Sequence, residues 1–253
     1  MEIEASVENQ VAIIRFARPQ KKNAITREMY AALTQAVLDA SANPAVRSLL
    51  FTGQPGVFTA GNDLQDFMLH AADGEPPSVA FMRALVACEK PVIAAVTGLA
   101  VGIGTTMLLH CDFVYVADDA RLTTPFVGLG LVPEFASSLL LPALVGQARA
   151  AGMLMLGDPL GAADAVALGI ANAALPAGEV FGHALRVAER FNALAPTAVR
   201  ETKRLMKRSG SDAVLRAIES EVATFMKSLG GPEAREALGA FFEKRKPDFS
   251  RFS

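Results

Sequence analysis

Residues 91–111 form a long apolar stretch that limits the possible folds of the chain. Glycines and threonines interrupt this stretch, which makes it a poor membrane span. A span needs about 18 or more apolar residues, so this stretch favours a buried strand, a glycine-rich turn and a helix. The strand-like run at 92–96 precedes Gly102 and Gly104, and a second such run follows at 112–116. A strand, a helix and a returning strand form a crossover unit, which predicts a parallel sheet.

The secondary structure expected from the sequence changes from the first half of the chain to the second. Apolar runs at 3–7 and 11–16 predict a hairpin, Thr26 has the position of a helix N-cap, and a short buried strand is expected at 48–51. Residues 71–78 are rich in alanine, glycine and proline, which predicts a loop. In the second half of the chain we expect only helices, at 137–144, 147–156, 162–168, 179–194, 196–208, 212–229 and 232–244. The chain is therefore predicted to be α/β at the front and all-helical at the back.

Composition restricts the class of protein. Of the 253 residues, 51% are hydrophobic and 20% are charged, which excludes a largely disordered chain. The net charge of −2 provides no general attraction for nucleic acid or for an anionic membrane. Cys88 and Cys111 form no disulfide or metal-ligand pattern, so a cytoplasmic location is expected. The acidic N-terminus has no apolar signal core, and residues 250–253 do not resemble a peroxisomal address.

The glycine-rich turn is the first candidate for chemistry. Gly102-Ile103-Gly104 opens the expected helix after a strand, so backbone N–H groups without helical partners should point into the turn. Such a site can bind a phosphate or a developing oxyanion. The dinucleotide-binding pattern fails, because Met107 stands where a third glycine is required. The alternative is that these glycines serve only close packing.

A second turn, residues 58–64, has a similar character, since it follows a short strand and leads into an expected helix. Its backbone offers another donor. Two such turns facing each other would form a strong oxyanion site, because the loss of one donor typically costs ~10²–10³ in rate. By itself the turn is ambiguous, and Asp63 equally fits a helix cap.

These turns and their surroundings resemble the crotonase (enoyl-CoA hydratase/isomerase) superfamily. The resemblance follows the family's order along nearly the whole chain, at residues 58–64, 90–98, 100–104, 111–112, 157–158, 162–165, 169–171 and 242–247. It implies an α/β fold, with a spiral of β-β-α units over residues 1–195 and a helical trimerisation region over 196–253. A homotrimer or hexamer is therefore expected.

The resemblance also implies where an acyl-CoA thioester binds. The backbone N–H groups of Asn62 and Ile103 are expected to form an oxyanion hole for the thioester carbonyl. Without the resemblance, Lys21 and Lys22 would simply belong to a solvated loop. Contacts to CoA and substrate are expected from Lys21, Asn23, Ala24, Ala60, Asp63, Leu64, Gly102, Phe126 and Lys244, with Phe241 as an alternative to Lys244. No metal or further cofactor is expected, because CoA is part of the substrate.

The family shares the oxyanion hole but not one reaction, so acid and base residues have to distinguish the activities. Hydratases of the family use two glutamates, and the matching positions here are Thr106 and Phe126. Neither side chain is a useful base near neutral pH. The resemblance therefore disfavours hydration.

Glu134 is the one carboxylate in the apolar stretch 125–139. From the residues alone it fits two interpretations, a charge at a helix N-terminus or a buried functional group. Pro-Glu-x-x-Ser-Ser after Gly-Leu-Val resembles the 3-enoyl-CoA to 2-enoyl-CoA isomerase branch, in which this glutamate is the sole catalytic base. An apolar wall should raise its pKa toward neutral and improve it as a base.

The sequence therefore favours an enoyl-CoA isomerase of fatty-acid or aromatic-acid degradation. Three alternatives stay open: the same site acting on a ring-derived or branched thioester, an enoyl-CoA hydratase, and a non-catalytic acyl-CoA-binding subunit. Among the other polar residues, we expect His70, His110, His183 and Asp112 to be structural or exposed. Cys111 has no histidine partner in the sequence, so a thiol nucleophile is not expected.

Overall fold

The computed structural model describes residues 2–69, 75–207 and 210–252. Within these residues the main sheet has six strands, in the spatial order β1 (Ile3–Glu8), β2 (Val11–Phe16), β3 (Ser48–Thr52), β5 (Val92–Val96), β7 (Phe113–Ala117) and β10 (Ala173–Leu175). β1 pairs antiparallel with β2, and the other neighbours pair parallel. The hairpin and the parallel crossover predicted from the sequence are confirmed.

A smaller sheet carries the turns that position the site. Within the described chain it consists of β4 (Val57–Thr59), β6 (Leu99–Val101), β8 (Arg121–Thr123) and β9 (Leu160–Gly161). The strands β4, β6 and β8 follow β3, β5 and β7 respectively, so the chain repeats a β-β-α unit. Because β4 and β6 are parallel neighbours, the turns that leave them lie side by side.

Two strand predictions need correction. The glycine-rich turn is not one turn, because Leu99–Val101 form β6 between Gly98 and Gly102. Three residues are too few to show an alternating pattern. The second half is not all-helical either, since β9 joins the smaller sheet and β10 closes the main sheet beside β7. β10 is Ala-Ala-Leu and lacks the β-branched or aromatic residues that identify a strand.

The helices surround the two sheets. The described ones are α1 (Arg27–Ala42), α2 (Leu64–Leu69), α3 (Pro77–Ala87), α4 (Ile103–Thr106), α5 (Ser137–Val145), α6 (Gln147–Ala151), α7 (Ala162–Ala167), α8 (Ala177–Arg190), α9 (Pro196–Lys207), α10 (Ser211–Leu229) and α11 (Pro232–Phe242). Shorter helical turns are η1 (Pro19–Lys21), η2 (Met107–His110), η3 (Val127–Leu129), η4 (Gly152–Leu156) and η5 (Phe191–Ala193). The helices expected in the second half are thus confirmed, and Thr26 caps α1 by accepting from the N–H of Met29 at 3.3 Å. Of the predicted loop 71–78, residues 71–74 lie outside the described part.

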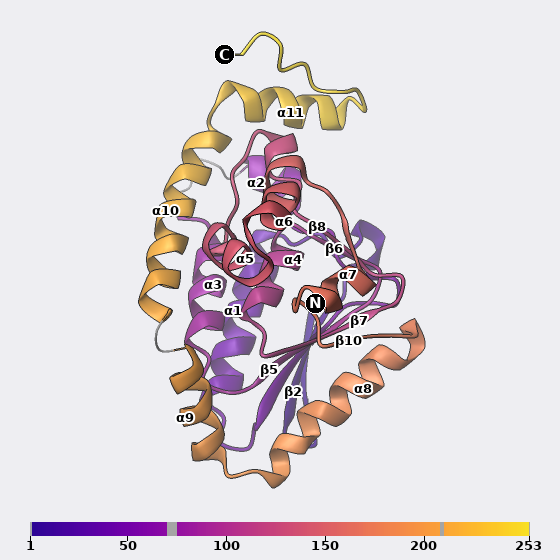
Figure 1. Ribbon diagram of the computed structural model, residues 1–253, viewed down its shortest axis with the longest axis vertical. Helices are drawn as coiled ribbons and strands as arrows, with labels where there is room; N and C mark the ends of the chain where they lie inside the picture. Colours follow the sequence, from indigo (N-terminus) through magenta and orange to yellow (C-terminus); the bar gives the residue numbers. More distant parts are fainter. Residues whose placement is uncertain (1, 70–74, 208–209, 253) are drawn as a thin grey trace.

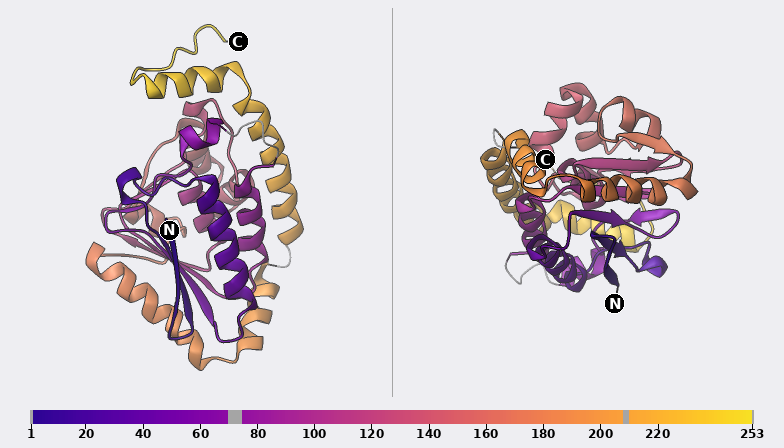
Figure 2. Two further views of the ribbon diagram at one scale, coloured as in Figure 1. Left: turned by 180° about the vertical axis from the view of Figure 1, so that it is seen from behind. Right: turned by 90° about the horizontal axis from the view of Figure 1, so that it is seen from below.

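The C-terminal helices enclose one side of the molecule. α9 and α10 run along this side, and α11 crosses its end (Figure 1). Seen from behind, α1 and α3 lie side by side, with α10 next to α3 (Figure 2). α8 packs across β3, β5 and β7. Among the described residues, no helix combines the length and the apolar character that crossing a membrane requires.

Buried aromatic rings connect the first half of the chain to the second. Phe51 on β3, Phe81 on α3 and Phe135 before α5 are all fully buried. Phe81 contacts the other two rings edge-on, with centroid distances of 6.2 and 6.3 Å. Phe135 is thereby anchored in the core, which restricts where the preceding residue, Glu134, can lie.

The turn between β5 and β6 depends on Gly98. Its φ is +62°, and a Cβ on this residue would lie 1.8 Å from the carbonyl oxygen of Gly56. We expect Gly98→Ala to lower the free energy of unfolding by about 2–4 kcal/mol, because the clash adds to left-handed strain. Gly128→Ala is the control, since nothing lies within 4 Å of its Cβ position, and it should change stability by less than about 0.5 kcal/mol. Equal urea-unfolding midpoints for the two variants would contradict the close approach.

Candidate active site

An open cleft of about 660 Å³ lies where the turns after β4 and β6 meet. Most residues predicted to bind substrate line it: Lys21, Ala24, Ala60, Asn62, Asp63, Leu64, Gly102, Ile103 and Phe126. The C-terminal helices complete the wall with Phe225 of α10 and with Phe241 and Phe242 of α11. The cleft is therefore largely apolar, with Lys21 and Lys22 as the cations in its wall.

Two predicted contacts, Asn23 and Lys244, are not at the cleft. Asn23 is fully buried, where its side-chain oxygen accepts from the N–H of Arg18 at 2.8 Å and its amide donates to two carbonyls of β4 at 3.1 and 3.0 Å. It therefore ties the lysine loop to the smaller sheet from behind. Lys244 is exposed beyond the end of α11, and Phe241 lines the cleft instead.

The two turns bring the backbone donors of Asn62 and Ile103 to the same cleft. The two turns approach each other so closely that a Cβ on Gly61 would lie 2.6 Å from the carbonyl oxygen of Val101. Gly61 and Gly102 have φ values of +81° and +56°, which L side chains rarely adopt. Within the described chain, neither the N–H of Asn62 nor that of Ile103 has a hydrogen-bond partner. Both are therefore free to bind an oxygen in the cleft.

Glu134 lines a narrow inner cavity that adjoins the cleft. Its side chain is 4% exposed, and Oε1 accepts a hydrogen bond of 2.6 Å from Thr106 Oγ1. Thr106 lies one helical turn after Ile103 in α4, so the carboxylate contacts the short helix that offers the backbone donor. The inner cavity, about 20 Å³, shares Asn62, Phe67 and Phe225 with the cleft. The space beside Glu134 therefore borders the cleft at Asn62.

The interpretation of Glu134 as a charge at a helix N-terminus is wrong. Helix α5 begins at Ser137, and the carboxylate at its start comes from Glu221 of α10. Glu221 accepts from the backbone N–H groups of Ala136 and Ser138, at 2.5 and 2.9 Å, and from the hydroxyl of Ser138 at 2.5 Å. The sequence offers no signal for this contact, because Glu221 and Ser138 lie 83 positions apart.

Burial controls the ionisation of Glu134. The loss of hydration raises its pKa to about 8; the hydrogen bond from Thr106 opposes this shift, and the charge of Glu221 adds to it. The expectation that an apolar wall raises this pKa is confirmed. Near neutral pH the group can therefore both accept and release a proton.

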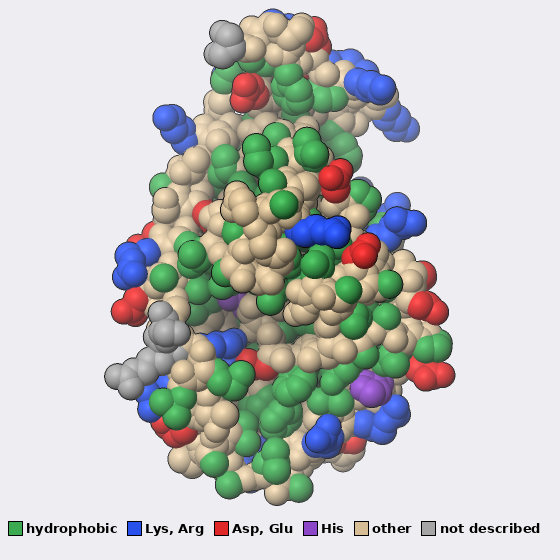
Figure 3. Space-filling model, viewed as in Figure 1, with side chains coloured by type: hydrophobic (Ala, Val, Ile, Leu, Met, Phe, Trp, Pro, Cys, Tyr) green, Lys and Arg blue, Asp and Glu red, His purple; other side chains and the backbone are tan. Residues whose placement is uncertain are grey.

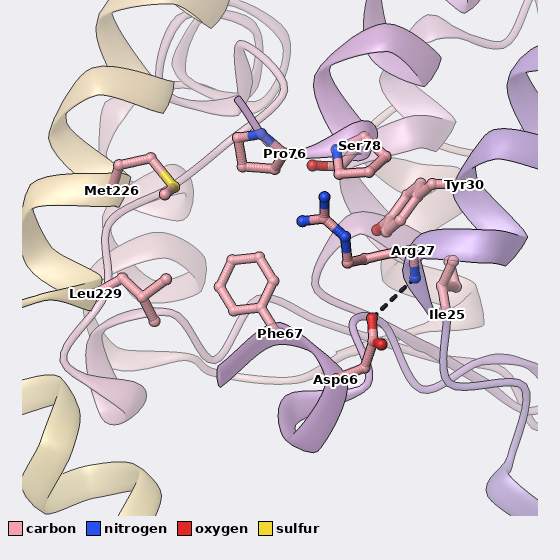
Figure 4. A pocket seen from close by; sticks show the side chains of 10 residues that line it. Ile25, Arg27, Tyr30, Asp66, Phe67, Pro76, Ser78, Met226 and Leu229 are labelled. Carbon is pink, nitrogen blue, oxygen red and sulfur yellow. Dashed lines mark hydrogen bonds between the residues drawn. The ribbon is translucent and has the colours of Figure 1, made fainter. Parts of the chain in front are cut away.

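Tyr30 is a residue of the site that the sequence did not indicate. It lies on α1, and its hydroxyl donates to the side-chain oxygen of Asn62. Burial raises the pKa of Tyr30 well above its ordinary value, and the charge of Glu134 adds to this, so the hydroxyl stays protonated. Phe67 points into the space between Tyr30 and α10, where a further narrow cavity lies (Figure 4). A tyrosine on the apolar face of a predicted helix indicates only core packing.

The aspartates considered from the sequence organise the backbone. Asp63 accepts two backbone N–H groups at the start of α2, at 3.1 and 3.2 Å, and pairs with Arg18 at 2.7 Å. Asp112 accepts from the first N–H of β5 and pairs with Lys203 of α9 at 2.7 Å. Asp112 is therefore structural as predicted, and Asp63 acts as a cap at the edge of the cleft.

His110 and His183 lie outside the cleft and the inner cavity. His110 stacks on Phe135 with ring centroids 3.9 Å apart, and burial lowers its pKa to about 4. His183 packs edge-on against Tyr115. His70 lies outside the described residues. The structural role expected for His110 is confirmed.

Exchange of the Glu134 carboxyl group for an amide should stabilise the protein in a pH-dependent way. Glu134 ionises near 4.5 when unfolded and near 8 when folded, so the wild type loses stability as the pH rises between these values. We expect the stability advantage of Glu134→Gln to grow by on the order of 2–3 kcal/mol from pH 4.5 to pH 7. Urea unfolding at both pH values measures it, and an advantage that does not change with pH would refute the raised pKa.

Known proteins share this fold. The chain matches the family model of enoyl-CoA hydratase/isomerase over residues 6–251. It is 34% identical to enoyl-CoA delta isomerase 2 of Rattus norvegicus, over 95% of this chain and 63% of that one, and 32% identical to crotonyl-CoA hydratase of Syntrophomonas wolfei, over 96% and 95%. The solved structure of OdaA from Pseudomonas aeruginosa has 49% identity and a TM-score of 0.93, covering 95% of this chain and 98% of that one. The chain therefore belongs to the enoyl-CoA hydratase/isomerase (crotonase) family.

Proposed function

We propose that this chain is an enoyl-CoA isomerase that moves the double bond of a 3-enoyl-CoA to position 2. The observation that carries the proposal is the buried carboxylate of Glu134 in a cavity that adjoins two unpaired backbone donors. The thioester carbonyl binds the N–H groups of Asn62 and Ile103. CoA lies along the cleft near Lys21 and Lys22, and since it is part of the substrate, no further cofactor is required.

The reaction needs one base that acts twice. Glu134 removes a proton from C2, and the electron pair moves toward the thioester oxygen, where the N–H groups of Asn62 and Ile103 stabilise the negative charge. Glu134 then returns the proton to C4 while the electrons form the C2–C3 double bond, which regenerates the carboxylate. A pKa of about 8 makes Glu134 a stronger base than an exposed glutamate while part of it stays ionised near neutral pH.

The surroundings of Glu134 favour isomerisation over hydration. At the positions where hydratases of the family have glutamates, this chain has Thr106, whose hydroxyl donates to Glu134, and Phe126, which is 5% exposed. Neither can activate a water molecule. The relative from Syntrophomonas wolfei is named a hydratase, but its name describes that protein.

The narrow inner space favours a linear acyl chain. The cavity beside Glu134 and the one beyond Phe67 each have a volume of about 20 Å³. Apolar side chains such as Val79, Met82 and Met226 border them. Each cavity holds about one water-sized group, so any acyl chain would require these side chains to move. A linear chain would displace fewer of them than a ring-derived or branched one, so a slender acyl end fits better.

We further propose that the protein forms the homotrimer or hexamer expected from the resemblance. Leu139 and Leu144 on α5 and Met155 and Leu156 in η4 are 40–79% exposed. The face drawn in Figure 3 shows many hydrophobic side chains around the area where Figure 1 draws α5 and α6. Contact with another copy of the chain would cover them.

The test is incubation with a linear 3-enoyl-CoA while the absorbance of conjugated 2-enoyl-CoA is followed. Wild type should form this product, and Glu134→Ala should lower kcat by ~10²–10⁴, the usual contribution of a general base. Glu179→Gln, which changes an exposed carboxylate on α8, should keep the wild-type rate. No conversion by wild type, or equal conversion by Glu134→Ala, would contradict the proposal.

The same preparation distinguishes the alternatives. A hydratase would convert 2-enoyl-CoA to 3-hydroxyacyl-CoA, whereas the proposed isomerase would not. A non-catalytic subunit would bind the thioester without turnover. Higher activity on branched or ring-derived thioesters than on linear ones would refute the proposed substrate class while leaving the isomerase chemistry intact.

A further inference from the structure

An unusual backbone turn follows the proposed base. Phe135 and Ala136, the two residues after Glu134, have φ values of +59° and +56°. L side chains rarely adopt this left-handed conformation, so two such residues in succession need support from their surroundings. The contacts that hold this turn also determine where the carboxylate of Glu134 lies.

The turn is held from two sides. On one side His110 stacks on Phe135, and its Nε2 donates to the carbonyl of Phe135 at 2.8 Å. On the other side Glu221 of α10 accepts from the N–H of Ala136 at 2.5 Å and from the N–H and hydroxyl of Ser138 at 2.9 and 2.5 Å. Glu221 is 8% exposed, so little water competes for these hydrogen bonds. It joins the left-handed turn to the first turn of α5.

We propose that Glu221 is a positioning residue for Glu134. It holds the left-handed turn that carries the base, and it places a second carboxyl group near that base. Glu221 lines neither the cleft nor the inner cavity, so it does not transfer a proton itself. This inference rests on the proposed function, because it assigns Glu221 a role in proton transfer by Glu134.

Burial and hydrogen bonds have opposite effects on the ionisation of Glu221. The pKa of Glu221 is raised, because burial outweighs the donors from Ser138 and Ala136, which lower it by stabilising the anion. This anion is in turn one of the causes, after burial, that raise the pKa of Glu134. Glu221 thus makes it harder for Glu134 to lose its proton, and removal of its charge should make it easier.

The other described groups around the turn are neutral, paired or exposed. On α9, Lys207 donates to the carbonyl of His110 at 3.1 Å, and both Lys203 and Lys207 pair with Asp112, at 2.7 and 3.3 Å. Burial lowers the pKa of His110 on η2 to about 4 and raises that of Tyr30 on α1, so both are neutral. On α3, Arg83 is paired with the exposed Glu75 at 2.9 Å. α5 has no titratable side chain. The other charged side chains of α10 are exposed: Asp212, Arg216, Glu219 and Lys227.

The test compares Glu221→Gln with Glu219→Gln, which removes an exposed carboxylate from the same helix. Glutamine at 221 keeps the size and one acceptor oxygen but not the charge. The measurement is kcat/KM for 3-enoyl-CoA isomerisation against pH, which rises as Glu134 loses its proton. In Glu221→Gln this rise should move to lower pH, and kcat should fall about 10- to 100-fold with KM changed less than about twofold. Glu219→Gln should match wild type.

The pH at which kcat/KM rises decides whether Glu221 acts on Glu134. If Glu221→Gln is folded and its activity rises at the same pH as that of wild type, the inference is overturned whatever the value of kcat, because support of the fold alone does not move the profile. If Glu221→Gln does not fold, Ser138→Ala replaces it and should lower kcat about fivefold without changing KM, since it removes one donor to Glu221. An unchanged kcat would then overturn the inference. A wild type that isomerises no 3-enoyl-CoA would instead refute the proposed function.

Discussion

A carboxylate buried among apolar side chains is the constraint on which the rest of the site depends. Glu134 loses its hydration on folding, and the one hydrogen bond that its side chain accepts within the described chain comes from Thr106. Its pKa therefore rises to about 8. A group that weakens the folded state in this way is typical of functional sites rather than of structural cores, and it is the property that a proton shuttle needs.

The position of this carboxylate follows from the way the chain repeats. Because β4 and β6 are parallel neighbours, their turns bring Asn62 and Ile103 to one cleft. α4 then supplies Thr106, the core anchors Phe135, and α10 supplies Glu221 to the turn between them. The base is therefore held jointly by the spiral core and by a helix of the region predicted to mediate trimerisation. Phe225 and Met226 of the same helix border the inner cavity, so α10 also shapes the site.

Local spacing in the sequence predicts the hairpin, the crossover, the helices of the second half and the two donor turns, because each depends on neighbouring residues. It misses β6 and β10, which are only three residues long. It also misses the contacts of Tyr30 and Glu221, since their partners are distant in the chain and each residue has an ordinary place on a helix. Motif position also does not show that the side chain of Asn23 bonds to β4 instead of lining the cleft. Fold and donor turns could thus be predicted, but the support of the base could not.

A double-bond shift on a single base requires one proton to travel from C2 to C4 on Glu134. A 3-enoyl-CoA labelled with deuterium at C2 is converted in ordinary water, and the product is analysed at low conversion. Because Glu134 is 4% exposed, we expect part of the deuterium to appear at C4 of the 2-enoyl-CoA. A product whose C4 hydrogen comes entirely from the solvent would contradict a sheltered shuttle on a single base.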